Sequence, residues 1–331
     1  MIKEEHSPAQ PPEPRSLRPF RRFLLLLLLI PALVYIAMFP LAMIPALGFD
    51  RWGGSRWAPV LNFGFHADHQ NADVVIFGDS SAAAGVDPRL VDAELGIRSV
   101  VLPNTLGSLP VTGDMALRRY LDHNTRPRLI VFYFSPWDLD YDRPGKDKFL
   151  FEGEQMLLRN GSWHDIASFA RRHPLALLAF PWQANSMLGV KNVWMTLRTD
   201  RQRDTAQAQG HIDYNDPIGP MHTPCEIPVA YLNDRSSSSV QQVVRRYAAR
   251  DLHVAVYLAP IPACNNAREI TSRTFPELGA APPATLPAAS FAADGLFAHI
   301  LPPFVPESSR LLASTLRSRP ELAQKPQPAS R

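Results

Sequence analysis

The sequence contains little cysteine and little net charge, and each shortage argues against a class of function. Its 331 residues include two cysteines, Cys225 and Cys264, and carry a formal net charge of +3. A structural zinc site needs more ligands at closer spacing, so no metal or other cofactor is predicted. The basic residues form no stripe with interleaved aromatic side chains, so a nucleic-acid partner is not expected.

Charge is also missing from one long segment near the N-terminus. No charged residue occurs from Phe23 to Phe49, and a helix crosses a bilayer with about 20 apolar residues. The alternative is a cleaved signal peptide, whose apolar core is usually about 7 to 15 residues long. We therefore predict that residues 23–49 form a transmembrane anchor in the lipid bilayer.

The residues on either side of this segment indicate its orientation. Residues 1–22 end in several arginines, and such residues remain in the cytoplasm, so 1–22 is predicted to be a cytoplasmic tail. The rest of the chain would then lie outside the inner (cytoplasmic) membrane, in the periplasm or its equivalent. Trp52 and Trp57 are expected at the far membrane interface. On this side Cys225 and Cys264 can form a disulfide, although either could be a free buried thiol.

Residues 72–318 show the alternation of an α/β domain. Short apolar segments predict strands at 74–77, 99–102, 129–134 and 253–258. Helices are predicted at 87–95, from 112 or 114 to 123, at 236–250 and at 306–316. Strands separated by helix-length segments indicate a parallel sheet with helices on both faces. The predicted fold class is α/β, a three-layer doubly wound parallel sheet.

The remaining segments are predicted to surround this sheet. An irregular approach segment is expected at 50–71 and a disordered tail at 319–331. Residues 140–233 interrupt the alternation and are predicted to form a mainly helical insertion over one edge of the sheet. Its helical stretches are expected near 155–160, 162–171 and 175–197, followed by a polar run at 198–209.

The stretch Ala72–Val86 contains the strongest candidate for a reactive group. A buried apolar strand ends in Gly78-Asp79-Ser80-Ser81 and passes into small residues. Open α/β sheets bind ligands at the carboxyl ends of their strands, and the following helix N-terminus favours negative charge. Ser80 is the expected nucleophile and Ser81 the neighbouring candidate, whereas Asp79 is expected to hold the turn. The turn could also be purely structural.

The residues around Ser80 resemble those of SGNH, or GDSL-type, serine hydrolases. The resemblance is greatest to the membrane-anchored bacterial branch that includes cell-envelope polysaccharide O-acetyltransfer proteins, and it covers about residues 72–138 and 291–316. It implies an SGNH/flavodoxin-like fold in which Ser80 attacks, His299 is the base and Asp294 orients it. It also implies oxyanion donors at the amides of Ser80 and Gly107.

Two parts of the sequence differ from that family. The family separates its aspartate and histidine by two residues, whereas four lie between Asp294 and His299. Trp137 stands where the family usually has an oxyanion asparagine, and Asn104 is the alternative side-chain donor. Trp137 could stack on a sugar ring or pack internally, and Asp138 could bind a sugar hydroxyl or cap its loop.

We therefore predict an extracytoplasmic esterase or O-acyltransferase that acts on a cell-envelope glycan through a Ser80 acyl-enzyme. The sequence does not distinguish hydrolysis from transfer. A membrane acyl-transfer partner that docks on the insertion is a further possibility. The alternative function is a catalytically inactive protein of the same fold that binds glycan or serves as a scaffold of an envelope assembly.

Overall fold

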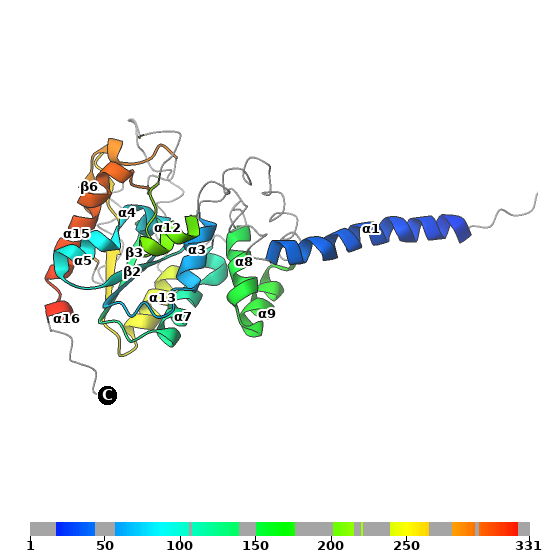
Figure 1. Cartoon of the computed structure of the whole chain (residues 1–331), viewed down its shortest axis with the longest axis horizontal. Coiled ribbons are helices and arrows are strands. Elements are labelled where there is room, and N and C mark those ends of the chain that lie inside the picture. The colour runs from blue at the N-terminus through cyan, green and yellow to red at the C-terminus, as the bar shows by residue number, and fades with distance from the viewer. Residues whose placement is uncertain are drawn as a thin grey trace, which may run out of the picture.

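The computed structural model describes most of the chain. The described residues are 18–43, 57–105, 108–138, 150–175, 201–214, 220, 239–264, 280–294 and 298–323. They form an α/β body, from which the N-terminal helix α1 (Arg18–Met43) extends beside α8 (Leu150–Asn160) (Figure 1).

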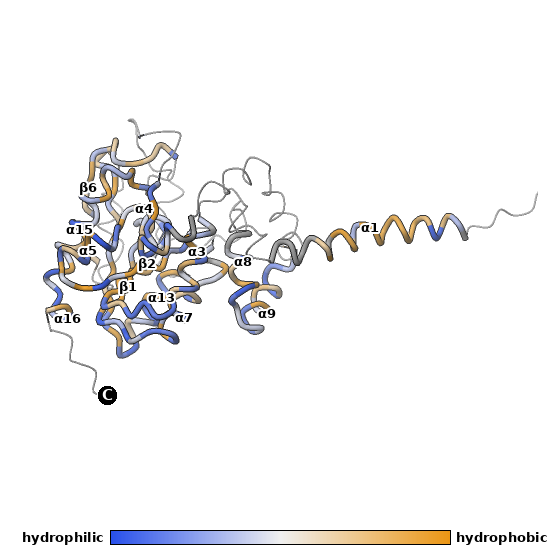
Figure 2. Tube along the Cα trace, in the orientation of Figure 1, coloured by the Kyte–Doolittle hydropathy of each residue, from blue (hydrophilic) through white to orange (hydrophobic). Residues whose placement is uncertain are grey.

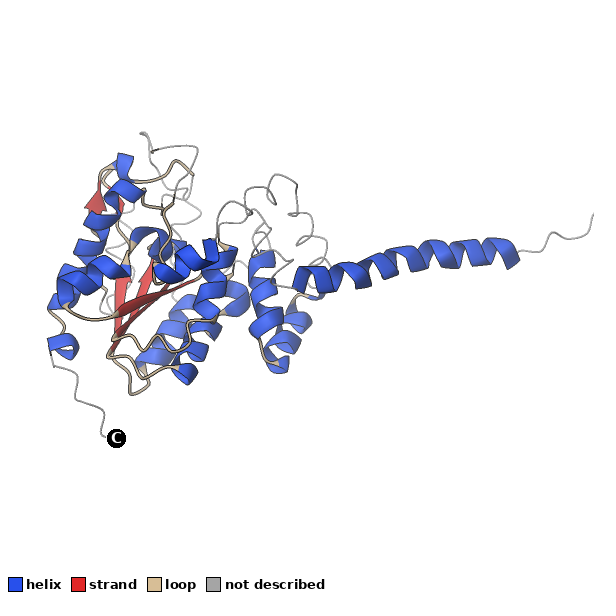
Figure 3. Cartoon of the chain, in the orientation of Figure 1, coloured by secondary structure: helices blue, strands red, loops and turns tan. Residues whose placement is uncertain are grey.

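The body is built on a parallel sheet, as the sequence predicts. Within the described residues this sheet has four strands, in the order β2-β1-β3-β4. They are β1 (Val74–Gly78), β2 (Ser99–Pro103), β3 (Leu129–Phe134) and β4 (Val254–Leu258). The register places Gly78 of β1 between Pro103 of β2 and Tyr133 of β3. The carboxyl ends of these three strands therefore lie side by side at one end of the sheet (Figure 3).

The strands are apolar on both sides because helices cover both faces of the sheet. In β1, Val75 and Phe77 belong to one buried cluster, while Val74 and Ile76 belong to another. Successive side chains of a strand point to opposite faces, so the two clusters lie on the two sides of the sheet. The described body therefore has three layers.

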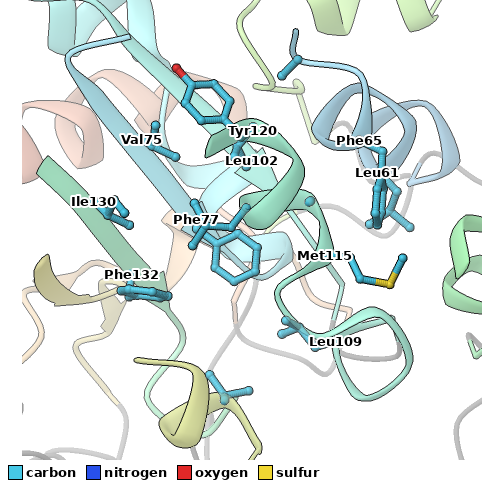
Figure 4. Packing of buried hydrophobic residues seen from close by; sticks show 14 of the residues in the cluster. Leu61, Phe65, Val75, Phe77, Leu102, Leu109, Met115, Tyr120, Ile130 and Phe132 are labelled. Carbon is cyan, nitrogen blue, oxygen red and sulfur yellow. The ribbon is translucent and has the colours of Figure 1, made fainter. Parts of the chain in front are cut away.

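Different helices cover each face. The larger cluster includes Leu61 of α3 (Ala58–Phe65), Leu109 of α6 (Leu109–Thr112), Leu117 of α7 (Met115–His123) and Val244 of α13 (Ser239–Ala248). Figure 4 shows part of this cluster packed around Phe77. The smaller cluster contains residues of α4 (Ser80–Gly85), α5 (Pro88–Leu95) and α15 (Val305–Arg317).

The insertion is described only in part. It contains α8, α9 (Trp163–Arg172) and α12 (Arg201–Gln207). A capping box begins α9, because Ser162 and Asp165 exchange side-chain and backbone hydrogen bonds. The predicted helical stretch 175–197 lies almost entirely outside the described residues.

Two predictions of irregular structure, at 50–71 and 319–331, were wrong, and the polar run at 198–209 contains a helix. The approach segment contains α3, whose apolar side chains pack against α7, α12 and β2. The polar run contains α12, which packs against α3 and so gains tertiary support that its sequence does not reveal. The expected tail begins with a short helix, α16 (Pro320–Ala323), whose Glu321 backbone oxygen accepts hydrogen bonds from Arg128.

Helix α1 exposes apolar side chains between Phe20 and Ile36. Phe23, Leu28 and Leu33 are 59%, 71% and 60% exposed, and the helix is coloured as predominantly hydrophobic in Figure 2. Among helices of the described residues, none has the combined length and hydropathy of a membrane span.

The chain has a disulfide at Cys264. The other cysteine of the sequence, Cys225, lies outside the described residues. Cys264 follows β5 (Ile261–Pro262), which pairs in parallel with β6 (Thr285–Leu286).

Gly78 is required where β1 turns into α4. A Cβ atom on this residue would lie 1.9 Å from the backbone oxygen of Tyr133 and 2.8 Å from the Cβ of Ala82. We expect Gly78→Ala to reduce the free energy of unfolding by about 3 kcal/mol or more, because the backbone must move apart. Urea unfolding of the full-length protein would measure this change.

Gly96 provides the matched control for that substitution. Gly96 has φ 64° and no atom within 4 Å of the added Cβ, so Gly96→Ala should cost only the backbone strain of about 1 kcal/mol. Equal losses at Gly78 and Gly96 would contradict the close approach of β1 and β3 that we describe.

Glu154 of α8 is a buried acid with an unusual titration. Its side chain is about 1% exposed, its Oε2 has no hydrogen-bond partner among the described residues, and burial raises its pKa to about 7. The unfolded chain loses this proton near pH 4.5. Stability should therefore fall by about 3 kcal/mol as the pH rises from about 4.5 to 7.

We expect Glu154→Gln to abolish this pH-dependent loss of folding stability. The variant should match the wild type near pH 5 and be more stable by up to about 3 kcal/mol near pH 8. Urea unfolding at both pH values would measure the difference, with the more exposed Glu94→Gln as the control. An equal pH dependence in wild type and Glu154→Gln would show that Glu154 ionises normally in the folded protein.

Candidate active site

Ser80 is held at the carboxyl end of β1 as the first residue of α4. Asp79 caps this helix: its Oδ1 accepts a hydrogen bond from the Ser81 amide at 2.8 Å, and its Oδ2 accepts from the Ser135 amide at 2.9 Å. The Asp79 carboxylate thus ties the turn to the end of β3. Ser81 donates its hydroxyl to the same carboxylate, which leaves Ser80 as the serine that faces the histidine.

His299 and Asp294 lie in one loop just before α15. The loop closes on itself through a bridge between Phe291 and Ile300, and the Ala292 amide donates to the His299 backbone oxygen at 2.9 Å. This closure brings residues 294 and 299 together although four residues separate them in the sequence. The intervening residues 295–297 lie outside the described part of the chain.

Ser80, His299 and Asp294 form a continuous chain of hydrogen bonds. His299 Nε2 lies 2.8 Å from Ser80 Oγ, and His299 Nδ1 contacts Asp294 Oδ2. A carboxylate can only accept, so the bond to Asp294 favours the tautomer with its proton on Nδ1 and leaves Nε2 free to accept the Ser80 proton. Ser80 is 7% exposed and His299 is 1% exposed. The arrangement has the geometry of a nucleophile, a base and an orienting acid.

Two aromatic residues that the sequence analysis did not place here surround the histidine. The rings of Tyr214 and His299 are stacked with centroids 4.2 Å apart, and the ring of Trp57 lies 5.1 Å from that of His299. Tyr214 also donates its hydroxyl to Asp294 Oδ2 at 3.0 Å. Trp57, which was expected at the membrane interface, lies beside His299.

The chain after α12 brings Tyr214 to this position. It runs along the edge of β2, where the Val101 amide donates to the Gln209 oxygen at 2.9 Å. The backbone then turns at Gly210, with φ 95°. The Ile212 amide donates to the backbone oxygen of Ala83, so this segment is attached to α4, the helix that begins with Ser80. No local sequence pattern signals this path.

The predicted oxyanion donors are described in part. Ser80 begins α4, so its amide has no acceptor within the helix and can serve a ligand. The Asn104 amide donates to the Gly78 oxygen at 2.7 Å, and its side-chain Oδ1 accepts from Ser108 Oγ at 2.6 Å. Asn104 Nδ2 lies 3.5 Å from the Gly113 oxygen. Gly107 lies outside the described residues.

The two predicted substrate-binding residues lie in the turn after β3. Trp137 is 5% exposed and Asp138 is 4% exposed. The Asp138 amide donates to the Ser135 oxygen at 2.9 Å. Both side chains are therefore buried in the turn and present little surface on which a sugar could stack.

A separate cavity of about 360 Å³ lies between α6, α7, α9 and α13. Several of its charged groups are paired: Asp114 bonds to Arg118 at 3.1 Å and to Arg246 at 3.0 Å, and Tyr247 donates to the same carboxylate. Neither Ser80 nor His299 is among its described lining residues. In the described part of the chain, no cluster of three or more His, Cys, Asp or Glu residues is arranged to hold a metal ion.

Comparison with protein-family models, curated proteins and solved structures found no match to this chain.

Proposed function

We propose that the protein is a serine esterase or O-acyltransferase of the SGNH type that acts through a Ser80 acyl-enzyme. The main support for this proposal is the chain of side-chain hydrogen bonds that runs from Ser80 through His299 to Asp294. The position of Ser80, at the carboxyl end of a parallel strand and the start of a helix, supports it further.

The geometry supports a two-step mechanism. Ser80 Oγ attacks the acyl carbonyl as its proton passes to His299 Nε2, and Asp294 stabilises the imidazolium that forms. The new C–O bond moves the carbonyl electron pair onto oxygen, where the Ser80 amide can donate to it. As the intermediate collapses, the leaving alcohol takes the proton from His299. Water or a sugar hydroxyl then attacks the acyl-enzyme with the same base.

The resemblance of the motifs supports an acetyl group on a cell-envelope glycan as the substrate. The strand order and the helices on both faces of the sheet agree with a doubly wound, SGNH/flavodoxin-like domain. Because Trp137 and Asp138 are buried, we assign recognition of the glycan to no particular side chain.

We also propose that the N-terminal segment anchors the protein in the inner membrane, with the catalytic domain in the periplasm. This part of the proposal depends on the sequence, in which the uncharged run continues to Phe49 and arginines precede it. The exposed apolar side chains of α1 support it, because they need a nonaqueous environment or a partner.

Burst kinetics with an aryl acetate would test the reaction. A purified, folded protein should release a first turnover of phenol in proportion to the enzyme concentration, because the acyl-enzyme forms faster than it is hydrolysed. Adding an acetyl-acceptor glycan would separate the two outcomes, since transfer increases turnover and yields acetylated sugar.

A folded protein that shows no burst and no turnover, with or without glycan, would exclude the proposed catalysis. It would favour the alternative, a glycan-binding or scaffold protein that retains the fold.

A further inference from the structure

Tyr214 contacts two members of the proposed triad at once. Its hydroxyl donates to Asp294 Oδ2, the oxygen that also contacts His299, and its ring stacks on the His299 imidazole. Tyr214 is 6% exposed. A buried tyrosine hydroxyl usually needs a hydrogen-bond partner, and here that partner is the carboxylate that orients the base.

Trp57 completes an aromatic group around the histidine. Its ring lies 5.8 Å from that of Tyr214 and 5.1 Å from that of His299. The face of an aromatic ring attracts a cation within about 6 Å of its centroid. His299 becomes a cation only when it takes the Ser80 proton, so this attraction increases as the reaction proceeds.

The two rings come from segments outside the α/β alternation. Trp57 directly precedes α3, in the segment that follows the N-terminal helix, and Tyr214 follows α12 of the insertion. The segment with Tyr214 is attached to α4 through the Ala83 oxygen, to which Ile212 and His211 both bond. Its position is therefore coupled to that of Ser80.

We propose that Tyr214 is a positioning residue that holds Asp294 against His299, and that Tyr214 and Trp57 stabilise the His299 imidazolium. This inference rests on the proposed function. It explains how an aspartate displaced in sequence can still orient the base: the insertion supplies a second donor to the carboxylate oxygen that contacts the histidine, and this donor fixes the aspartate.

The test compares Tyr214→Phe with wild type in aryl acetate hydrolysis by the full-length protein. This variant keeps the ring and removes the hydroxyl, so kcat/KM should fall about tenfold or more, the usual effect of losing a hydrogen bond to a charged group. Tyr120→Phe is the matched control, because that buried hydroxyl accepts from the Ala72 amide at 2.8 Å, away from the triad. It should change kcat/KM by less than about twofold.

The pH profile separates positioning from stability. Without the Tyr214 hydroxyl, Asp294 is held less firmly against His299, so the pH dependence of kcat/KM should change as well as its magnitude. A merely structural role would lower activity equally at every pH. Trp57→Leu should reduce kcat/KM about threefold to tenfold by removing one ring.

Proton NMR of the His299 Nδ1–H provides a readout that does not need catalysis. Its resonance, identified by its loss in His299→Ala, should shift or disappear in Tyr214→Phe and remain in Tyr120→Phe. An unchanged resonance with unchanged kcat/KM and pH profile would overturn the role of Tyr214. A folded wild type without activity, whose resonance still responds to Tyr214→Phe, would instead overturn the proposed function alone.

Discussion

Ser80→Ala is expected to reduce aryl acetate hydrolysis by at least about 10⁴-fold, and His299→Ala is expected to cause a similar loss. The reason is that the two side chains act as one unit: the hydroxyl is a poor nucleophile without the base, and the base has no other role. His299 Nε2 and Ser80 Oγ are 2.8 Å apart and both are buried. The double variant should therefore lose little more than either single variant.

Steady-state kinetics of the three variants would measure this dependence, with circular dichroism to verify folding. His253→Ala is the control histidine, because His253 precedes β4 and its side chain is 67% exposed. Losses that multiply in the double variant would contradict a shared step. Residual activity within about tenfold of the wild type in Ser80→Ala would show that another group attacks.

Asp294→Asn is expected to reduce kcat/KM by about 10³- to 10⁴-fold. The amide can present an N–H to His299 Nδ1, which favours the tautomer with the proton on Nε2, and this ring can no longer accept the Ser80 proton. The substitution also alters the acceptor for the Tyr214 hydroxyl. The protein should still fold, because asparagine fills nearly the same volume.

Asp251→Asn is a suitable control for this substitution, because Asp251 is fully exposed and forms a surface pair with Arg126. The same hydrolysis assay, measured from acidic to alkaline pH, would detect the change. A loss smaller than about tenfold for Asp294→Asn would indicate that another group orients His299 and that the contact with Asp294 is incidental.

The parallel sheet could be predicted because its strands are nearly continuous apolar segments. Leu129–Phe134 is buried at every position, as a strand between two helix layers must be. The order and register of the strands could not be read from such segments, since β-branched and aromatic residues fit any central position. The register matters for the site because it places Gly78, at the end of β1, beside Tyr133 of β3.

Helix α3 escaped prediction because its stabilising contacts are tertiary. Its sequence, APVLNFGF, contains a proline, a glycine and two aromatic residues, and has low helix propensity. Leu61 and Phe65 are each about 1% exposed, in contact with residues distant in sequence. Packing stabilises a helix whose local preference is weak.

The candidate site was predictable where the chemistry is local and unpredictable where it depends on the path of the chain. Ser80 belongs to a recognisable turn, and His299 precedes a predicted helix. The contribution of Tyr214 depends on an edge contact with β2 and a left-handed turn at Gly210. A motif search has no means of joining such a residue to Asp294, which is 80 positions away in sequence.

The measurement that tests the central proposal most directly is labelling of the full-length protein with a fluorophosphonate, followed by peptide mapping. The proposed mechanism predicts one adduct, on Ser80 Oγ, that is lost in Ser80→Ala and greatly slowed in His299→Ala. A folded protein that remains unlabelled, or whose adduct maps to Ser81 or another residue, would contradict it.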